Sequence, residues 1–246
     1  MMKKLLVSTL LLMGGMSMQA QAAGSEALIK QNLQKVNARI QVESISEAPV
    51  KGMYEVMLNT GEVLYSDEKG EYFLLGKLYQ FSEQEGFVDL TEQKQSALRK
   101  EALAKIPAEQ MIVYPPKGEV KATVNVFTDV DCPYCRKLHA EVPKLNAMGV
   151  QVNYLAFPRQ GAGTATYRDM VSIWCATDAA ARRKAMDMAK NGGDLEAKTC
   201  DDPVLDQLHL GQNMGVTGTP AIVLSDGTLL PGYVPAAQLA KTLELN

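Results

Sequence analysis

The feature that most constrains this chain is a pair of cysteines, Cys132 and Cys135, placed where a strand pattern gives way to a helix pattern. An apolar, β-branched run over residues 124–127 precedes the pair, and a helical pattern follows it. The start of a helix offers unpaired N–H groups and the positive end of the helix dipole, and both favour a thiolate. The spacing therefore predicts a redox-active dithiol in a strand–turn–helix unit.

The two cysteines of the motif are expected to have different roles. We expect Cys132 to be the outer nucleophile, with an exposed thiolate at the helix start, and Cys135 to be the more buried resolving thiol. Pro133 suits the first helical turn, because the N–H that proline lacks is not needed there. Asp129 and Asp131 raise the local negative potential and oppose a thiolate, but we expect the helix terminus to prevail.

Other chemistries of paired cysteines fit this sequence less well. A c-type haem site needs a histidine directly after the second cysteine, where this chain has Arg136. A structural zinc site needs a second close pair, and Cys175 and Cys200 are far apart. A cysteine hydrolase needs a general base; we expect His139 to be a surface residue of the helix, and only tertiary folding could bring His209 near. The sequence predicts redox chemistry without a metal or cofactor.

The N-terminal residues have the pattern of a signal peptide. Lys3 and Lys4 precede an apolar run over residues 5–13, and small residues end at Ala22. The run is too short to span a bilayer. We predict a signal peptide over residues 1–22, with cleavage after Ala22 or, alternatively, after Ala23, and an exported mature chain. The formal net charge of −3 is mild and argues against a nucleic-acid partner.

All of the chain's cysteines lie in its second half, and the count of four is even. An even count in an exported protein favours disulfides. Beyond the motif, Cys175 and Cys200 remain, and Trp174 beside the first of them suggests burial. We favour a structural disulfide between them, and a second redox relay is the alternative.

The first part of the mature chain predicts a small α+β domain over residues 23–88. Residues 25–41 have the spacing of a short amphipathic helix, and residues 42–81 read as an antiparallel meander with turn residues between apolar runs. Gly76 lies inside the apolar run 74–79, which predicts a strand with a bulge or a close backbone approach there. The functional interpretation of Gly76 is strand pairing across a dimer interface.

A linker helix is predicted within residues 89–107. The helical pattern covers 91–105, with an N-cap at Thr91 or nearby and an end at Pro107. Its narrow apolar stripe favours an exposed spacer, and the alternative is an ordinary packed helix of the second domain.

The second domain, residues 108–246, alternates between strand and helix patterns. Strands are expected at the four runs 121–127, 150–157, 221–224 and 228–230. Helices are expected after Cys132, through most of 164–210, and over 235–245, and Pro143 should kink the first of them. Thr219-Pro220 precedes a strand, where the residues alone favour a trans bond. This is the thioredoxin order of elements with a helical insertion.

With these motifs in view, the mature chain resembles the DsbC-type periplasmic disulfide isomerases. The resemblance rests on the segments 109–114, 126–129 and 154–161, on Ile173-Trp174-Cys175-Ala176, on Gly215-Val216-Thr217-Gly218-Thr219-Pro220-Ala221 and on Pro231-Gly232-Tyr233. The first domain matches in organisation more than in motif.

The resemblance implies a V-shaped homodimer, in which a helix links each dimerisation domain to a thioredoxin-like domain. Both dithiols would face an apolar cleft for misfolded, disulfide-containing exported proteins, and a DsbD-type membrane reductant would keep them reduced in the periplasm. It implies these site residues: Cys132 as nucleophile, Cys135 as resolving cysteine, Thr219-Pro220 as the cis-proline loop, Cys175–Cys200 as a structural disulfide and Gly76 in the dimerising strand.

The sequence departs from the DsbC pattern inside the motif. Pro133-Tyr134 stands where that family usually has Gly-Tyr, and this pair occurs in DsbG-type proteins. Val126 stands where thioredoxin has a buried acid, so proton handling must differ from that of thioredoxin. The predicted activity is reduction and isomerisation of incorrect disulfides. One alternative is a DsbG-like reductase of sulfenylated cysteines, and another is a holdase chaperone with secondary redox activity.

Overall fold

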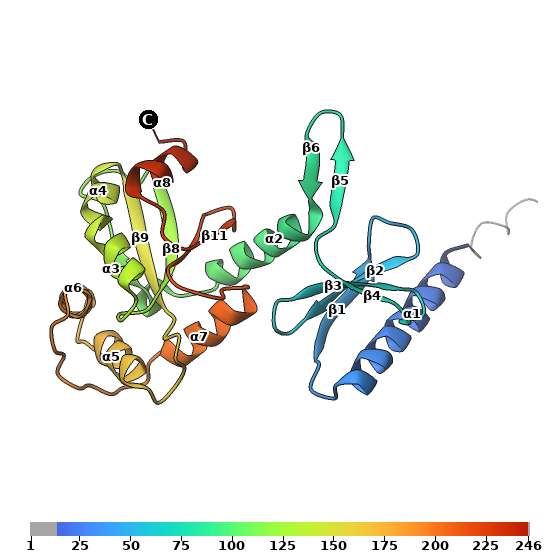
Figure 1. Cartoon of the computed structure of the whole chain (residues 1–246), viewed down its shortest axis with the longest axis horizontal. Helices are drawn as coiled ribbons and strands as arrows, with labels where there is room; N and C mark the ends of the chain where they lie inside the picture. The colour runs from blue at the N-terminus through green and yellow to red at the C-terminus, as the bar shows by residue number, and fades with distance from the viewer. Residues whose placement is uncertain (1–13, 246) are drawn as a thin grey trace, which may run out of the picture. The chain divides into compact units, whose positions relative to one another are not determined.

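The computed structural model describes residues 14–245 in backbone terms and side chains from residue 23 onward. The first thirteen residues of the predicted signal peptide lie outside the described part. The described residues form two compact units, the first ending at Leu78 and the second beginning at Tyr79 (Figure 1). The predicted domain boundary at residue 88 stays a prediction.

The first unit is one helix against a four-stranded antiparallel sheet. Helix α1 (Gly14–Val36) runs through the predicted cleavage site and ends earlier than expected, where a turn begins and the Asn37 side chain accepts the Arg39 N–H at 2.9 Å. The strands lie in the order β1-β2-β3-β4, which confirms the predicted meander. Their bounds are β1 Val42–Glu47, β2 Met53–Leu58, β3 Val63–Asp67 and β4 Phe73–Leu75.

Packing of α1 on the sheet explains the core of this unit. Ile29 and Leu33 on α1 are buried against Tyr54 and Val56 of β2. The turn before β4 comes so close that a Cβ on Gly70 would lie 2.8 Å from the Ile29 Cα, and its φ of +67° is left-handed. Only glycine meets both demands at this turn.

The predicted strand through Gly76 is wrong in its extent. Strand β4 ends at Leu75, whose partner is Leu64, and Gly76 lies in a bend. The next strand, β5 (Tyr79–Ser82), pairs with β6 (Gly86–Asp89) in a separate hairpin. Glycine has no side chain to pack on a sheet, so it weakens a strand at this point.

Helix α2 (Leu90–Ala104) follows the hairpin and packs on the second unit. Its N-cap is Asp89, whose carboxylate accepts the Glu92 N–H at 2.9 Å, and not Thr91. Arg99 is buried and donates from Nε to the Gly227 carbonyl at 2.7 Å. The prediction of a largely exposed spacer is therefore wrong for the second half of α2, since a buried hydrogen bond and apolar packing hold it.

The second unit is built on a mixed five-stranded sheet in the order β11-β10-β8-β9-β7. Strands β8 and β9 are parallel, and the other neighbours are antiparallel. The bounds are β7 Ile112–Tyr114, β8 Ala122–Thr128, β9 Val150–Ala156, β10 Ala221–Val223 and β11 Leu229–Pro231, with a 3-10 turn at Ala108–Gln110.

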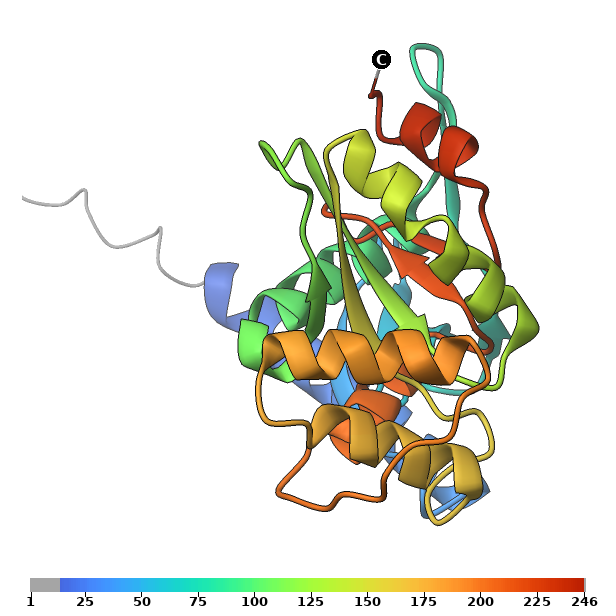
Figure 2. The same ribbon diagram turned by 90° about the vertical axis from the view of Figure 1, so that its left-hand side faces the viewer.

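Helices cover both faces of this sheet. The crossover from β8 to β9 contains α3 (Pro133–Ala140) and α4 (Val142–Ala147). The remaining helices are α5 (Ala165–Trp174), α6 (Ala179–Lys190), α7 (Val204–Asn213) and α8 (Ala236–Thr242). Helix α6 contacts both α3 and β7. In Figure 2, α6 is the orange helix that lies across the front of the sheet.

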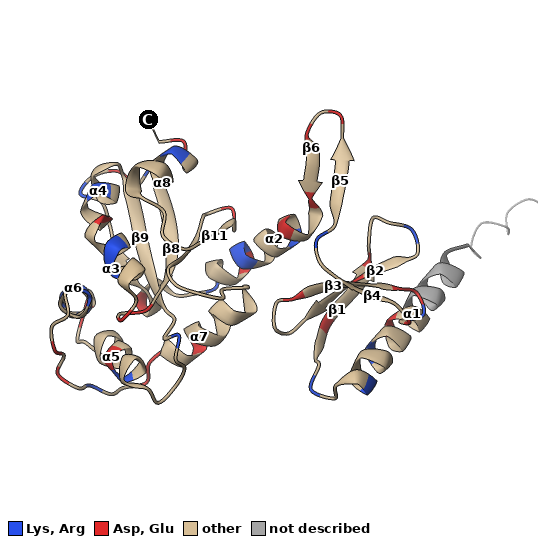
Figure 3. Ribbon diagram, in the orientation of Figure 1, with Lys and Arg blue, Asp and Glu red and all other residues tan. Residues whose placement is uncertain are grey.

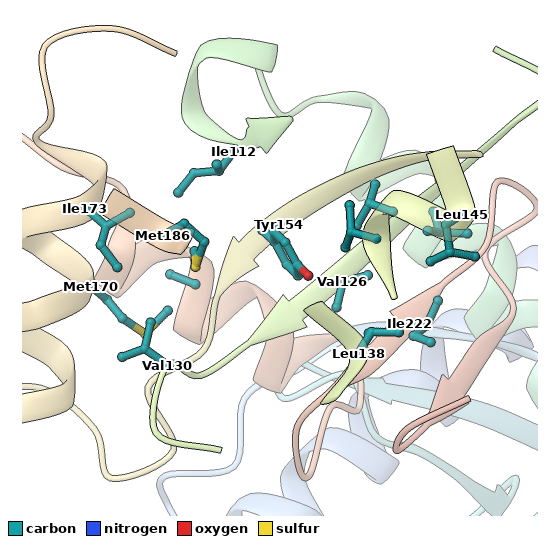
Figure 4. Packing of buried hydrophobic residues seen from close by; sticks show 14 of the residues in the cluster. Ile112, Val126, Val130, Leu138, Leu145, Tyr154, Met170, Ile173, Met186 and Ile222 are labelled. Atoms are coloured by element: carbon teal, nitrogen blue, oxygen red, sulfur yellow. The ribbon is translucent and has the colours of Figure 1, made fainter. Parts of the chain in front are cut away.

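Alternation along the strands divides the core into two clusters. Val126 and Tyr154 point to one side, where Leu138 of α3 packs with them (Figure 4). Their neighbours Phe127 and Leu155 point to the other side, where α7 and the end of α2 cover them. The motif cysteines thus follow a strand that is buried on both faces.

The predicted kink at Pro143 is confirmed as a break. Helix α3 ends and α4 begins at Glu141. The Glu141 carboxylate accepts the Ala236 N–H at 2.6 Å and the Tyr233 hydroxyl, so the break is tied to the start of α8.

The predicted α+β class is confirmed, with a helix-plus-antiparallel-sheet unit followed by a mixed-sheet unit. In the described residues, no helix is both long and apolar enough to cross a membrane. Lys and Arg residues are interspersed with Asp and Glu residues in both units (Figure 3).

Candidate active site

The two motif cysteines lie at the start of α3, as predicted, and both are free thiols. Cys132 is the N-cap residue, with an extended backbone, and Pro133 opens the helix. Cys135 is in the first turn, and Tyr134 between them is 61% exposed. The Cys132 side of the motif therefore has the unpaired N–H groups of a helix start around it.

The predicted exposure of Cys132 is wrong, because Cys132 is only 2% exposed and Cys135 only 1%. The physical reason is the loop before β10. Its Thr219-Pro220 bond is cis, and the Cys132 thiol donates to the Thr219 carbonyl at 3.2 Å. The structure thus brings the cis-proline loop against the dithiol, as the resemblance implies.

The environment separates the two thiols by their acidity. Burial raises the pKa of the Cys132 thiol, but the nearby Thr219 side chain, Cys135 and the Tyr134 N–H outweigh it, so this pKa lies below its ordinary value. Burial raises the pKa of Cys135 above its ordinary value, although the Lys190 charge and the Thr128 hydroxyl oppose it. Cys132 is the better thiolate, which suits a nucleophile.

Asp129 and Asp131 do not act as free negative charges beside the motif. The buried Asp129 carboxylate accepts the Asp131 N–H at 2.8 Å and both the backbone N–H and Nε of Arg159 at 3.0 Å. Asp131 pairs with Arg136 at 3.3 Å and accepts the Thr166 hydroxyl. The positive charges of Arg159 and Arg136 therefore offset the negative potential of the two carboxylates, which was expected to oppose a thiolate.

His139 is not the surface residue that we predicted. Its side chain is 11% exposed, and its ring packs against the rings of Tyr114 and Tyr154, with centroid distances of 5.5 and 5.7 Å. Its Nε2 lies 3.0 Å from Asp187 Oδ1, and Nδ1 lies 3.2 Å from the Tyr154 hydroxyl. His139 lies four residues after Cys135, and this helical spacing could have indicated that both side chains share one face of α3. The elements that cover this face, β7 and α6, come from elsewhere in the chain.

One polar residue at the dithiol, Lys190, was missed by sequence reasoning. Lys190, at the end of α6, is 4% exposed and donates to Thr128 Oγ1 at 2.6 Å and to the Asp129 carbonyl at 2.9 Å. The available signal was the position of Lys190 four residues after the buried Met186 on the apolar face of α6. A lysine at such a position is ordinarily expected to reach solvent.

The second cysteine pair is bonded. Cys175 and Cys200 form a disulfide with a Cα–Cα distance of 5.7 Å, which connects the end of α5 to the segment before α7. Trp174 is buried as expected, but Cys200 is exposed. Among the described residues, no cluster of three or more His, Cys, Asp or Glu side chains could hold a metal ion.

Replacing Thr219 by valine is expected to raise the pKa of Cys132. The Thr219 hydroxyl is buried without a hydrogen-bond partner of ordinary geometry, yet it lies close enough to both sulfurs to lower the pKa of each thiol. The measurement is thiolate absorbance against pH in a Cys135→Ala background. Thr217→Val, at an exposed position of the same loop, is the control. An unchanged pKa in Thr219→Val would contradict the assignment.

The same shift predicts a pH dependence for the reduced protein. Because the folded pKa of Cys132 lies below the unfolded one, the thiolate adds stability above the unfolded value, and this stability is lost as pH falls through the folded pKa. Because Thr219→Val should raise the folded pKa of Cys132, it should reduce the stability that the thiolate adds. The loss of that stability should also begin at a higher pH as the pH falls.

Comparison with known proteins agrees with this geometry. A family model described as a thioredoxin-like domain matches residues 107–245, and one described as a disulfide bond isomerase protein N-terminal domain matches residues 19–92. The chain is 40% identical over 225 residues to the thiol:disulfide interchange protein DsbC of Dickeya dadantii, which covers 92% of this chain and 89% of the relative. It is 39% identical over 224 residues to DsbC of Escherichia coli, covering 91% of this chain and 89% of the relative.

Solved structures include a partial match. A disulfide interchange protein from Neisseria gonorrhoeae is 29% identical with a TM-score of 0.49, covering 56% of this chain and 96% of that one. The two family models together span both units, and the curated relatives align along most of the chain. The chain therefore belongs to the DsbC family of thiol:disulfide interchange proteins, a family of thiol–disulfide oxidoreductases with a thioredoxin-like domain.

Proposed function

We propose that this protein reduces and isomerises incorrect disulfides in exported proteins, and that it works in the periplasm as a homodimer. The observation that supports this activity is the difference in acidity between two thiols at one helix start. The pKa of Cys132 is lowered, and that of Cys135 is raised. A nucleophile must be a thiolate at neutral pH, whereas a resolving thiol acts only after the first bond has formed.

The exchange begins when the Cys132 thiolate attacks one sulfur of a mispaired disulfide. A bond forms between Cys132 Sγ and that sulfur, the substrate disulfide breaks, and the second substrate sulfur leaves as a thiolate. Isomerisation follows when another substrate thiolate attacks the mixed disulfide and releases Cys132. Reduction follows when Cys135 attacks Cys132 instead, and a membrane reductant of the DsbD type then returns the dithiol to its reduced form.

The experiment that tests the activity is refolding of a protein with scrambled disulfides. We expect the reduced protein to restore the native pairings in catalytic amounts. The same preparation is tested on a protein sulfenic acid, because Pro133-Tyr134 also occurs in DsbG-type proteins. Rapid reduction of the sulfenic acid with no refolding of the scrambled protein would reject the isomerase proposal in favour of the reductase.

Export is supported by the N-terminal pattern over residues 1–22, which predicts a signal peptide. The bonded Cys175–Cys200 pair also fits an oxidising compartment. Misfolded, disulfide-containing exported proteins are the substrates that this location would provide. Fractionation of cells should recover the processed protein, beginning near Ala23, with the periplasmic contents.

The homodimer is supported by an exposed apolar edge in the first unit. Strand β4 is at the edge of its sheet, and Leu74 and Leu75 are 51% and 74% exposed. An open apolar edge of this kind is a template for pairing with another chain. The position of Gly76 directly after β4 fits the role that the resemblance gives it in the dimerising strand.

Replacing Gly76 by arginine is expected to weaken the dimer. A Cβ at Gly76 would meet nothing within 4 Å inside the protomer, so we expect arginine to leave the protomer folded and to act against a partner. Sedimentation velocity over a dilution series measures the dissociation. Gly76→Ala is the matched control, because it adds a Cβ without bulk or charge. An arginine variant that stays as dimeric as the alanine variant would defeat the assignment.

A further inference from the structure

Lys190 is a buried base whose amine reaches the loop that carries the dithiol. It is 4% exposed, and both acceptors of its hydrogen bonds, the Thr128 hydroxyl and the Asp129 carbonyl, are neutral oxygens. Burial lowers the pKa of Lys190 to about 8, against the opposing effects of Cys135 and Asp129. An amine that titrates near neutral pH can both give and take a proton.

The Thr128 hydroxyl connects this amine to the resolving thiol. Its oxygen accepts the Lys190 amine at 2.6 Å, and the hydroxyl lies close enough to Cys135 to act against the burial that raises the pKa of that thiol. The inward residue of β8 below the motif is Val126, which cannot carry a proton (Figure 4). The Thr128 hydroxyl therefore binds the Lys190 amine directly and also interacts with the Cys135 thiol.

We propose that Lys190 accepts the proton of Cys135 through the Thr128 hydroxyl when Cys135 attacks the mixed disulfide. The inference rests on the thiol–disulfide exchange proposed above. The hydroxyl takes the thiol proton and passes its own proton to the neutral amine. The Cys135 thiolate then bonds to Cys132 Sγ, the bond from Cys132 to the substrate sulfur breaks, and the electron pair leaves on that sulfur. The dithiol is oxidised by two electrons, and the substrate disulfide is reduced by two.

The amine also has a route by which the proton reaches solvent. A cavity of about 780 Å³ is lined by Lys190 together with Arg136, His139 and Asp187. This is large enough for several water molecules. The proton that Lys190 takes from Cys135 can leave through this cavity before the next cycle.

Other charged and titratable groups face Lys190 from each element around it. The carboxylate of Asp129 and the thiols favour its charged form, and Arg136 opposes it. The Tyr154 ring centre lies 5.8 Å from the amine, and burial and the Lys190 charge lower the pKa of His139. These groups are Cys132 at the N-cap of α3, Cys135, Arg136 and His139 on α3, Asp129 after β8, Tyr154 on β9 and Asp187 on α6.

The test separates the two steps of exchange with oxidised glutathione. Attack by Cys132 depends on glutathione concentration, whereas resolution by Cys135 does not, so acid quenching and mass spectrometry give both rates at each pH. In the wild type, the resolving rate should rise with pH and level off above about pH 8, where the amine is neutral. In Lys190→Met it should fall about 10-fold at neutral pH and keep rising past about pH 9, with the attack rate unchanged.

Lys184→Met is the matched control, since Lys184 is exposed on the same helix, and it should behave as the wild type. Thr128→Val removes the connecting hydroxyl but keeps the amine, and it should slow resolution in the same way. If Lys190→Met fails to fold, Thr128→Val takes its place as the test. A wild-type resolving rate and pH profile in the folded variant would overturn the proposal. Failure of the wild-type protein to refold a scrambled substrate would instead reject the isomerase function. The two outcomes are distinguishable, because the glutathione assay does not require isomerase activity.

Discussion

Replacing Cys132 by alanine is expected to abolish disulfide exchange, with a loss of roughly 1,000-fold or more in insulin reduction and in refolding of a scrambled protein. The reason is that Cys132 supplies the attacking thiolate, and its pKa is the one that the helix start and the Thr219 loop lower. Cys135 cannot replace it, because burial raises the pKa of that thiol.

Cys135→Ala is the matched variant, and it should fail differently. Its Cys132 still attacks disulfides, so mixed disulfides with substrate proteins should accumulate and appear on non-reducing gels. Cys132→Ala should form none. It should retain some ability to hold unfolded proteins, because that needs only a surface. If Cys132→Ala kept all protective activity on disulfide-containing clients, chaperoning rather than thiol chemistry would be the main role.

Replacing Gly227 by alanine is expected to cost about 3 kcal/mol or more of stability. A Cβ at Gly227 would lie 1.9 Å from the Ser96 carbonyl oxygen, and the φ of +91° is left-handed. Both neighbours are backbone, so α2 would have to move away from the turn before β11. That shift would also break the buried hydrogen bond from Arg99 to the Gly227 carbonyl.

The control for this clash is Gly192→Ala, and urea denaturation of the two variants measures the difference. Gly192 also has a left-handed φ, +78°, but nothing lies within 4 Å of its Cβ position. It should lose only about 1 kcal/mol, the cost of the left-handed backbone. Equal losses of unfolding free energy in the two variants would show that the close approach of α2 to this turn does not make the Gly227 substitution more costly.

The parts of the fold that the sequence predicted are those with local patterns. The strand before Cys132, the helix after it and the meander of the first unit depend on periodicity and turn residues that lie side by side in the sequence. The break at Pro143 follows in the same way from the chemistry of proline, which has no N–H to donate in a helix.

The parts that the sequence did not predict depend on contacts between distant segments. Cys132 is buried because a loop 87 residues later covers it, and most of the His139 side chain is covered by β7 and α6. The second half of α2 packs on the sheet, although its stripe suggested exposure. Lys190 lies beside the dithiol because α6 contacts α3, and no local motif marks that contact.

The most direct test of the proposed isomerase is the thiol state of the protein in growing cells. Acid quenching followed by a bulky maleimide counts the free thiols, and the Cys175–Cys200 disulfide serves as an internal reference for oxidation. An isomerase must begin each cycle with a thiolate, so we predict that Cys132 and Cys135 are mainly reduced while the reference pair is oxidised. Finding Cys132 and Cys135 mainly joined in a disulfide would contradict the proposal and indicate a dithiol oxidase.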